Sequence, residues 1–270
     1  MRGLHSPEIE IQHNAKLKLY PDGYSLTIAN KPIFIESGWE VVGDNPKKPK
    51  PKNMDGEIRP DNIKRAKQKV MDIARLNTFQ WFITWTLDKR EIDRYDPKEV
   101  SRKLKTFLMN KVKRNAAVYL IIAEYHKNVD DNNGQAIHMH GLLSGNFKMV
   151  DSGKKTKSGQ TIYNMSDWKL GFSTAIELDE NISAISRYIT KYISKDFCKI
   201  FGSFYYAGGH NLIRKPQYKL FNLDYASVNI KEYSNEYLSF KYKDFADEIE
   251  TANFISEHRQ GGGYCEHSTD

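Results

Sequence analysis

The sequence predicts an α+β fold in which helices flank a central antiparallel β-sheet. Two apolar, strand-like segments at 117–126 and 136–143 are separated by a polar, turn-forming stretch, which predicts a β-hairpin in the middle of the sheet. Three other segments, at 61–76, after 96 and at 179–196, repeat apolar residues at helical spacing and supply the helices.

Composition restricts the kind of partner. The 270 residues include 41 Lys and Arg against 34 Asp and Glu, a formal charge of +7 that suits an anionic partner. Cys198 and Cys265 lack metal-site spacing, so we expect a reduced, cytoplasmic protein. No apolar run reaches membrane-spanning length and no secretory leader opens the chain, so neither export nor a membrane partner is expected.

The chain divides into three expected parts. Residues 1–57 are expected to form a small β appendage, with strands on either side of a turn at 21–23, and then a Lys- and Pro-rich linker. Residues 58–235 form the main domain. Residues 236–270 form a C-terminal segment that ends in a Gly-containing, disordered tail.

The main domain begins with a basic helix at 61–76 and a strand at 79–87. A second helix starts at Asp96 and Pro97, since proline is favoured in the first turn. Both helices have one apolar face, and we take the lysines on their other faces to be solvated by default.

The central hairpin carries a candidate metal site. Side chains alternate along a strand, so His138 and His140 share one face and can close on a single metal ion. Glu124, near the open end of the partner strand, can add a carboxylate, and His126 competes with it for that role. A packed or surface histidine is the plain alternative. The opposite face carries Ile137, Met139 and Leu143, which point into the core.

Residues 145–168 are polar, and we expect a long loop that is either functional or disordered. Lys154, Lys155 and Lys157 lie in it and are candidate phosphate contacts. A strand at 172–178 follows.

The helix at 179–196 places two tyrosines beside an apolar stripe. Tyr188 and Tyr192 are one turn apart, with Lys191 and Lys195 on their outer flank. The alternative is that the two rings only pack against the core. The stripe consists of Ile182, Ile185, Ile189 and Ile193.

An aromatic segment follows at 204–212 and contains a Gly pair. Tyr205 and Tyr206 can stack on bases, each at about 1–3 kcal/mol. Packing against the sheet is equally compatible with this pattern.

Three of these segments resemble motifs of the HUH endonucleases, the metal- and tyrosine-dependent nickases of rolling-circle replication. His138-Met139-His140 is similar to the His-hydrophobe-His motif, and residues 188–195 are similar to the two-tyrosine motif of phage gene A and gene II-like proteins. Residues 82–88 resemble the upstream Thr-rich strand, with Thr84 and Thr86. The motifs appear in family order over residues 79–196.

The resemblance implies an HUH or RRM-like topology and a replication initiator that nicks single-stranded origin DNA. Glu124, His138 and His140 would hold Mg or Mn, Tyr188 or Tyr192 would attack phosphorus, and Lys191 and Lys195 would neutralise charge. Residues 58–235 would be the nicking domain, and a 5′-phosphotyrosine link would preserve bond energy for rejoining.

The implied DNA contacts are Thr84, Thr86, Lys154, Lys155, Lys157, Tyr205 and Tyr206. The sequence contains no phosphate-binding Gly-x-x-x-x-Gly-Lys-Ser/Thr loop, so a host helicase and polymerase are expected partners. The replicon would be a phage or a plasmid.

Two other classes fit part of the pattern. Two His and a carboxylate also describe a non-haem iron oxygenase, although such sites usually use His-x-Asp/Glu and a distant His. In a non-catalytic nucleic-acid-binding protein the basic helices would carry the function and the His pair would be structural.

Overall fold

The computed structural model of the chain describes residues 11–35, 60–126, 135–179, 182–193, 199–234 and 237–259. The expected linker at 43–57, Lys195 and the tail from 260 onward lie outside these residues. Among the described residues, no helix has the length and apolar character needed to cross a membrane.

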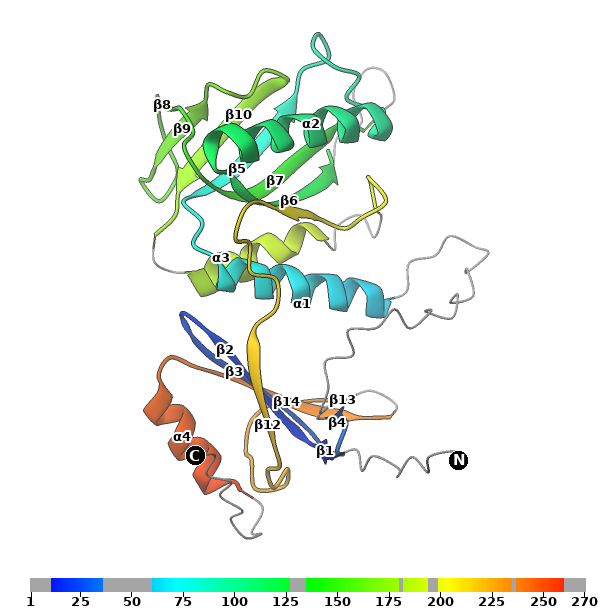
Figure 1. Cartoon of the computed structure of the whole chain (residues 1–270), viewed down its shortest axis with the longest axis vertical. Helices are drawn as coiled ribbons and strands as arrows, with labels where there is room; N and C mark the ends of the chain where they lie inside the picture. Colours follow the sequence, from blue (N-terminus) through cyan, green and yellow to red (C-terminus); the bar gives the residue numbers. More distant parts are fainter. Residues whose placement is uncertain are drawn as a thin grey trace, which may run out of the picture. The chain divides into compact units, whose positions relative to one another are not determined.

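The chain forms two compact units, drawn in Figure 1. Residues 53–215 form the first, here called the central unit. Residues 1–52 and 216–270 together form the second, here called the terminal unit. The expected boundary at 235 therefore runs through the terminal unit, because residues 217–234 pair with strands from the start and the end of the chain.

The central unit contains a seven-stranded antiparallel sheet in the order β11-β6-β7-β5-β10-β9-β8. This arrangement confirms the α+β class, and β7, which carries both histidines, lies inside the sheet between β6 and β5. The strands are β5 (Trp81–Leu87), β6 (Val118–Tyr125), β7 (Ile137–Ser144), β8 (Met149–Lys155), β9 (Thr161–Met165), β10 (Gly171–Glu177) and β11 (Tyr206–Gly208).

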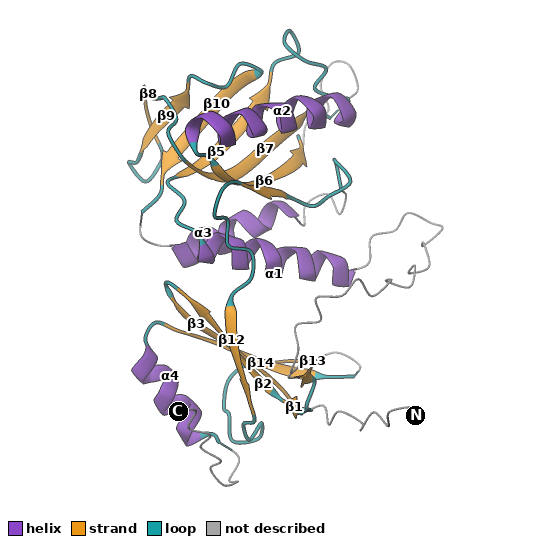
Figure 2. Cartoon of the chain, in the orientation of Figure 1, coloured by secondary structure: helices purple, strands orange, loops and turns teal. Residues whose placement is uncertain are grey.

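Helices cover both faces of this sheet (Figure 2). Helix α2 (Pro97–Asn115) packs on one face, and α1 (Pro60–Leu76), α3 (Ile182–Ile189) and the 3-10 turn η1 (Thr190–Ile193) pack on the other. The side chain of Asp96 caps α2 by accepting a 2.8 Å hydrogen bond from the backbone N–H of Lys98, and Pro97 is its first residue, as the sequence predicts.

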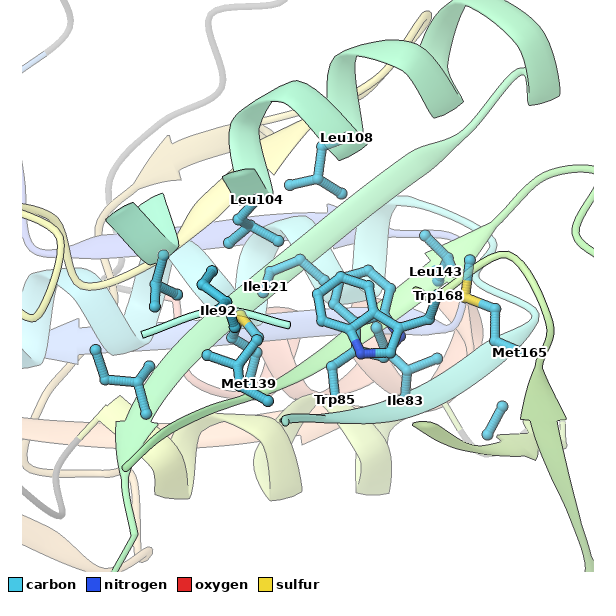
Figure 3. Close-up of a cluster of buried hydrophobic side chains, with 14 residues drawn as sticks. Ile83, Trp85, Ile92, Leu104, Leu108, Ile121, Met139, Leu143, Met165 and Trp168 are labelled. Carbon is cyan, nitrogen blue, oxygen red and sulfur yellow. The ribbon is translucent and has the colours of Figure 1, made fainter. Parts of the chain in front are cut away.

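The core under α2 is built around two tryptophans (Figure 3). Trp85 of β5 and Trp168 stack with ring centroids 4.5 Å apart. Met139 of β7 and Leu104 and Leu108 of α2 pack into the same cluster. The odd-numbered residues of β7 are thereby buried against α2, so its even-numbered residues, including both histidines, face α1 and α3.

The core on the other face joins the sheet to α1, α3 and η1. Leu120, Ile122 and Leu142 of the sheet pack with Val70 of α1 and Ile189 of α3. Burial of this apolar stripe holds the tyrosine segment against the strand that carries the histidines.

Residues 145–168 are not the long loop expected from the sequence. They contain β8 and β9, which pair as a hairpin at the sheet edge. Lys154 and Lys155 conceal the strand pattern, because charged residues are common on edge strands, where they discourage edge-to-edge association. Gly153, with φ +71°, lies in the register shift between Asp151 and Lys154, and such bulges also interrupt alternation.

The tyrosine segment is helical but not one continuous helix. Helix α3 ends at Ile189, and η1 carries residues 190–193. The buried Thr190 hydroxyl donates a 2.7 Å hydrogen bond to the carbonyl oxygen of Arg187 at this junction. Tyr188 therefore lies in α3 and Tyr192 in η1.

The terminal unit is a five-stranded antiparallel sheet in the order β12-β2-β3-β14-β13, with α4 (Glu248–Glu257) beside it. Its strands are β2 (Ala15–Tyr20), β3 (Gly23–Ala29), β12 (Gln217–Phe221), β13 (Glu232–Ser234) and β14 (Ser239–Phe245), and the short pair β1 (Gln12–His13) and β4 (Phe34–Ile35) is separate. The expected strands around 21–23 are β2 and β3.

Asn14 joins the two ends of the chain in this unit. Its buried side chain donates a 2.8 Å hydrogen bond to the carbonyl oxygen of Leu223 and accepts a 2.9 Å bond from the N–H of the same residue. Gly23 has φ +128°, and a Cβ there would lie 2.2 Å from the Phe245 carbonyl oxygen, so the β2–β3 turn requires glycine.

We predict that Asn14→Ala destabilises the terminal unit by about 1–3 kcal/mol for each of the two Leu223 backbone groups it leaves unsatisfied. Hydrogen exchange should show lost amide protection in β2, β3, β12 and β14, with β6 and β7 unchanged. Asn229→Ala, at an exposed position, is the matched control. Equal protection in both variants would contradict this role of Asn14.

Candidate metal and tyrosine site

Glu124, His138 and His140 form one group on neighbouring strands. Glu124 of β6 lies directly across from His138 of β7, and Ile122 lies across from His140. The carboxylate oxygens are 3.5 Å from Nε2 of His138 and 3.9 Å from Nε2 of His140. One ligand atom from each residue falls within 4.8 Å of the others, so these three side chains could hold a metal ion.

The third strand orients one of these imidazoles. Thr84 of β5 lies across from His140, and its Oγ1 is 3.1 Å from Nδ1 of that ring. A hydrogen bond at Nδ1 leaves Nε2 directed at Glu124, and when Nδ1 is the protonated nitrogen the Nε2 lone pair is available to a metal. Thr86, the next residue on this face, lies across from His138.

The chemistry of these donors fits a divalent cation. The Glu124 side chain is only 4 % exposed, and a buried carboxylate needs a compensating charge. Nε2 of His138 is buried and has no hydrogen-bond partner among the described residues. Two imidazoles and a carboxylate suit first-row divalent ions, and Mn²⁺ and Mg²⁺ also accept carboxylate oxygen.

The two candidates for the third ligand differ in position. Glu124 lies between the two histidines in the group, whereas His126 is exposed and its ring meets the His138 ring edge-on, with centroids 5.3 Å apart. The geometry therefore favours Glu124.

Both tyrosines reach this group. The ring of Tyr192 stacks on His140 with centroids 3.8 Å apart and planes 15° from parallel. Its hydroxyl donates a 2.9 Å hydrogen bond to the hydroxyl of Tyr188, a residue that is 44 % exposed. Phe82 of β5 supports both rings, at 5.4 Å from Tyr188 and 6.4 Å from Tyr192. The two phenols thus meet at one point beside His140.

Local electrostatics keep Tyr192 protonated. Burial raises the pKa of its phenol well above the usual value, and the hydrogen bond to Tyr188 and the nearby Glu124 carboxylate raise it further. Lys191 lies with Nζ 5.0 Å from the centre of the Tyr188 ring. A cation at this distance favours negative charge on the phenol oxygens.

The face that carries the histidines continues across β10. Phe172 lies across from Thr86 and Thr174 across from Thr84, so both share the face of His138 and His140. Phe172 is 67 % exposed, unusually open for a phenylalanine inside a sheet. The sequence analysis overlooked it and Phe82; strand alternation in 172–178 and 79–87, counted from the Thr-rich motif, would have placed both on this face.

The other expected DNA contacts lie elsewhere. Lys154 and Lys155 are on the edge strand β8, and Lys157 is in the turn after it. Tyr205 packs among side chains on the α1 and α3 face, while Tyr206 packs on the α2 face and donates to the carbonyl oxygen of Phe201 at 3.1 Å. The structure therefore does not bring the two tyrosines to one surface, and their contact with DNA stays a prediction.

Comparison with known proteins singles out this region. Residues 80–197 match the family described as replication-associated protein ORF2/gene 2 protein. No curated protein and no solved structure matches the chain. The metal group and both tyrosines thus lie in a segment that is similar to replication-associated proteins of phages and plasmids.

Proposed function

We propose that this protein initiates rolling-circle replication by nicking single-stranded origin DNA and later rejoining it. The observation that carries the proposal is the stacking of Tyr192 on His140, which brings a nucleophile to a group that could bind a metal. The similarity to replication-associated proteins over residues 80–197 supports it independently.

Glu124, His138 and His140 would hold the ion, Mg²⁺ or Mn²⁺. When bound, a divalent ion polarises a phosphate oxygen and stabilises the charge that develops on it. Thr84 keeps the His140 ring in the orientation that this requires. Phe82 and His140 hold the Tyr192 ring between them, which limits its motion before attack.

In the proposed reaction, a tyrosine oxygen forms a bond to phosphorus as the bond from phosphorus to the 3′ oxygen breaks. The phenol loses its proton and the 3′ oxygen gains one, so the products are a 5′-phosphotyrosine and a 3′-hydroxyl. Lys191, and by resemblance Lys195, neutralise charge near the phenols. A later 3′-hydroxyl can attack the link and rejoin the strand, because the number of phosphoester bonds is unchanged.

We assign the first cut to Tyr192, since its ring lies directly on His140, and the second to Tyr188. Their hydroxyls are only 2.9 Å apart, so both can reach one scissile phosphate in turn with little motion of α3. A single chain could then start and finish a replication cycle.

The DNA strand would cross the sheet on the face of the histidines. Phe172 offers a ring on which a base can stack, and Thr84, Thr86 and Thr174 offer hydroxyls beside it. Lys154, Lys155 and Lys157 at the sheet edge would attract phosphates. Host helicase and polymerase would act on the nicked phage or plasmid replicon in the cytoplasm.

The first prediction tests the function with labelled single-stranded oligonucleotides that tile the replicon carrying this gene. Wild type with Mn²⁺ or Mg²⁺ should cut one of them and form a covalent adduct on a denaturing gel. His140→Ala should form none while DNA binding largely survives, and EDTA should mimic it. His210→Ala, an exposed histidine outside the group, should cut normally. Full cleavage by His140→Ala in EDTA would exclude the metal-assisted mechanism.

The second prediction concerns the two tyrosines. Tyr188→Phe and Tyr192→Phe should each form some adduct, whereas the double variant should form none, because either hydroxyl can reach the phosphate. Peptide mapping of the wild-type adduct should find DNA on both residues under strand-exchange conditions. The alternating scheme fails if one single variant is inert and the other nicks and rejoins repeatedly.

The third prediction concerns Thr84. Thr84→Val keeps the shape of the side chain but removes the hydrogen bond to His140, so Mn²⁺ affinity should fall about 10–100-fold. Thr84→Ser should restore most of it. Thr174→Val, an exposed threonine on the same face, is the control. Isothermal titration with Mn²⁺ measures the effect, and unchanged affinity in Thr84→Val would show that the contact does not position the ring.

A further inference from the structure

The terminal unit has a sheet with two very different faces. One face forms its core, in which Leu17, Leu26, Ile28 and Phe245 pack with Phe254 of α4. Since neighbouring residues of a strand point to opposite sides, the residues between these form the other face. That other face is here called the aromatic face.

Cross-strand register makes the aromatic face continuous over all five strands. Tyr218 of β12 lies across from Lys18 of β2, and Lys16 of β2 lies across from Thr27 of β3, which lies across from Tyr242 of β14. On the last two strands, Phe240 of β14 lies across from Tyr233 of β13.

The rings on this face are open to solvent. Tyr218, Tyr233 and Tyr242 are each 50 % exposed. Tyr242 lies between Phe240 and Tyr233, with ring centroids 6.1 Å and 5.6 Å away. An aromatic cluster left exposed on a sheet marks a surface that binds something, because solvated sheet faces normally carry polar residues.

Cations accompany the rings. Nζ of Lys16 lies 4.0 Å from the centre of the Tyr218 ring, and Nζ of Lys231 lies 5.1 Å from that of Tyr233. Lys18 is on the same face, where Asp244, across from Ser25, is the acidic residue at one end. The acidic residues Asp247, Glu248 and Glu250 belong to the α4 segment instead.

We propose that the aromatic face is a second binding site for single-stranded DNA, separate from the metal and tyrosine site. Bases stack on Tyr218, Tyr242 and Tyr233, and Lys16, Lys18 and Lys231 contact the phosphates between them. Flat rings separated by lysines match a strand whose bases are unpaired, since a duplex keeps its base faces inside the stack. This site does not require the nicking activity, because every residue in it belongs to the terminal unit.

The test uses the full-length protein in EDTA, so that binding is measured without cleavage. Fluorescence anisotropy with oligo(dT) should give wild-type affinity for Ile249→Ala, an exposed apolar residue of α4. Tyr218→Ala/Tyr242→Ala should bind about ten- to a hundredfold more weakly, and Tyr218→Phe/Tyr242→Phe, which keeps both rings, should bind nearly as wild type does. Hydrogen exchange in β2 and β3 checks that the variants are folded.

Three results would overturn the proposal. The first is unchanged oligo(dT) affinity in the Ala double variant. The second is an equal loss for duplex DNA of the same length, which would indicate phosphate contacts alone. The third is tighter binding of oligo(U) RNA than of oligo(dT), with the same dependence on the two rings, which would make RNA the ligand.

Crosslinking gives a readout that does not depend on a folded variant. Oligonucleotides with 5-iodouracil, irradiated with wild-type protein, should attach to peptides containing Tyr218, Tyr233 or Tyr242. Crosslinks confined to the central unit would exclude a second site. Loss of adduct formation in the nicking assay together with intact crosslinks here would refute the proposed function and leave this site standing.

Discussion

The antiparallel register of β7 between β6 and β5 determines the whole site. It sets Glu124 across from His138 and Thr84 across from His140, and so brings a carboxylate and a hydroxyl to the two imidazoles. A slip of one residue would turn both histidines into the α2 core and expose Met139. The register is protected because the odd-numbered residues of β7 pack around the stacked pair of Trp85 and Trp168, where a shift would bury polar rings.

The tyrosine segment depends on the same sheet. Ile189 and Ile193 anchor it in the core formed with Leu120, Ile122 and Leu142, on the face of the histidines. A 3-10 turn advances side chains by about 120° per residue where an α-helix advances them by about 100°. The change from α3 to η1 at Thr190 therefore rotates Tyr192 further around the axis than a continuous helix would, while its hydroxyl stays within 2.9 Å of Tyr188.

Local pattern was sufficient for the parts of the site that lie on one hairpin. Alternation predicts the shared face of His138 and His140, and the turn between the strands predicts Glu124 near them. The contact between Thr84 and His140 joins residues 56 apart, so it follows only from how β5 pairs with β7. The β8–β9 hairpin was missed because an edge strand can carry lysines where an inner strand cannot. The closure of the terminal unit has no local signal either, since Asn14 finds its partner 209 residues away.

The central unit is inserted, in sequence, between strands of the terminal unit, so the chain passes from one to the other twice. If both units bind the same DNA strand, the second contact is intramolecular and its effective concentration is set by the connection and not by the protein concentration. Weak stacking on Tyr218 and Tyr242 then raises the total affinity without a tighter grip at His138 and His140. That division suits an enzyme that joins strands as well as cutting them, because an initiator must keep hold of a strand whose scissile phosphate it has to release and take up again.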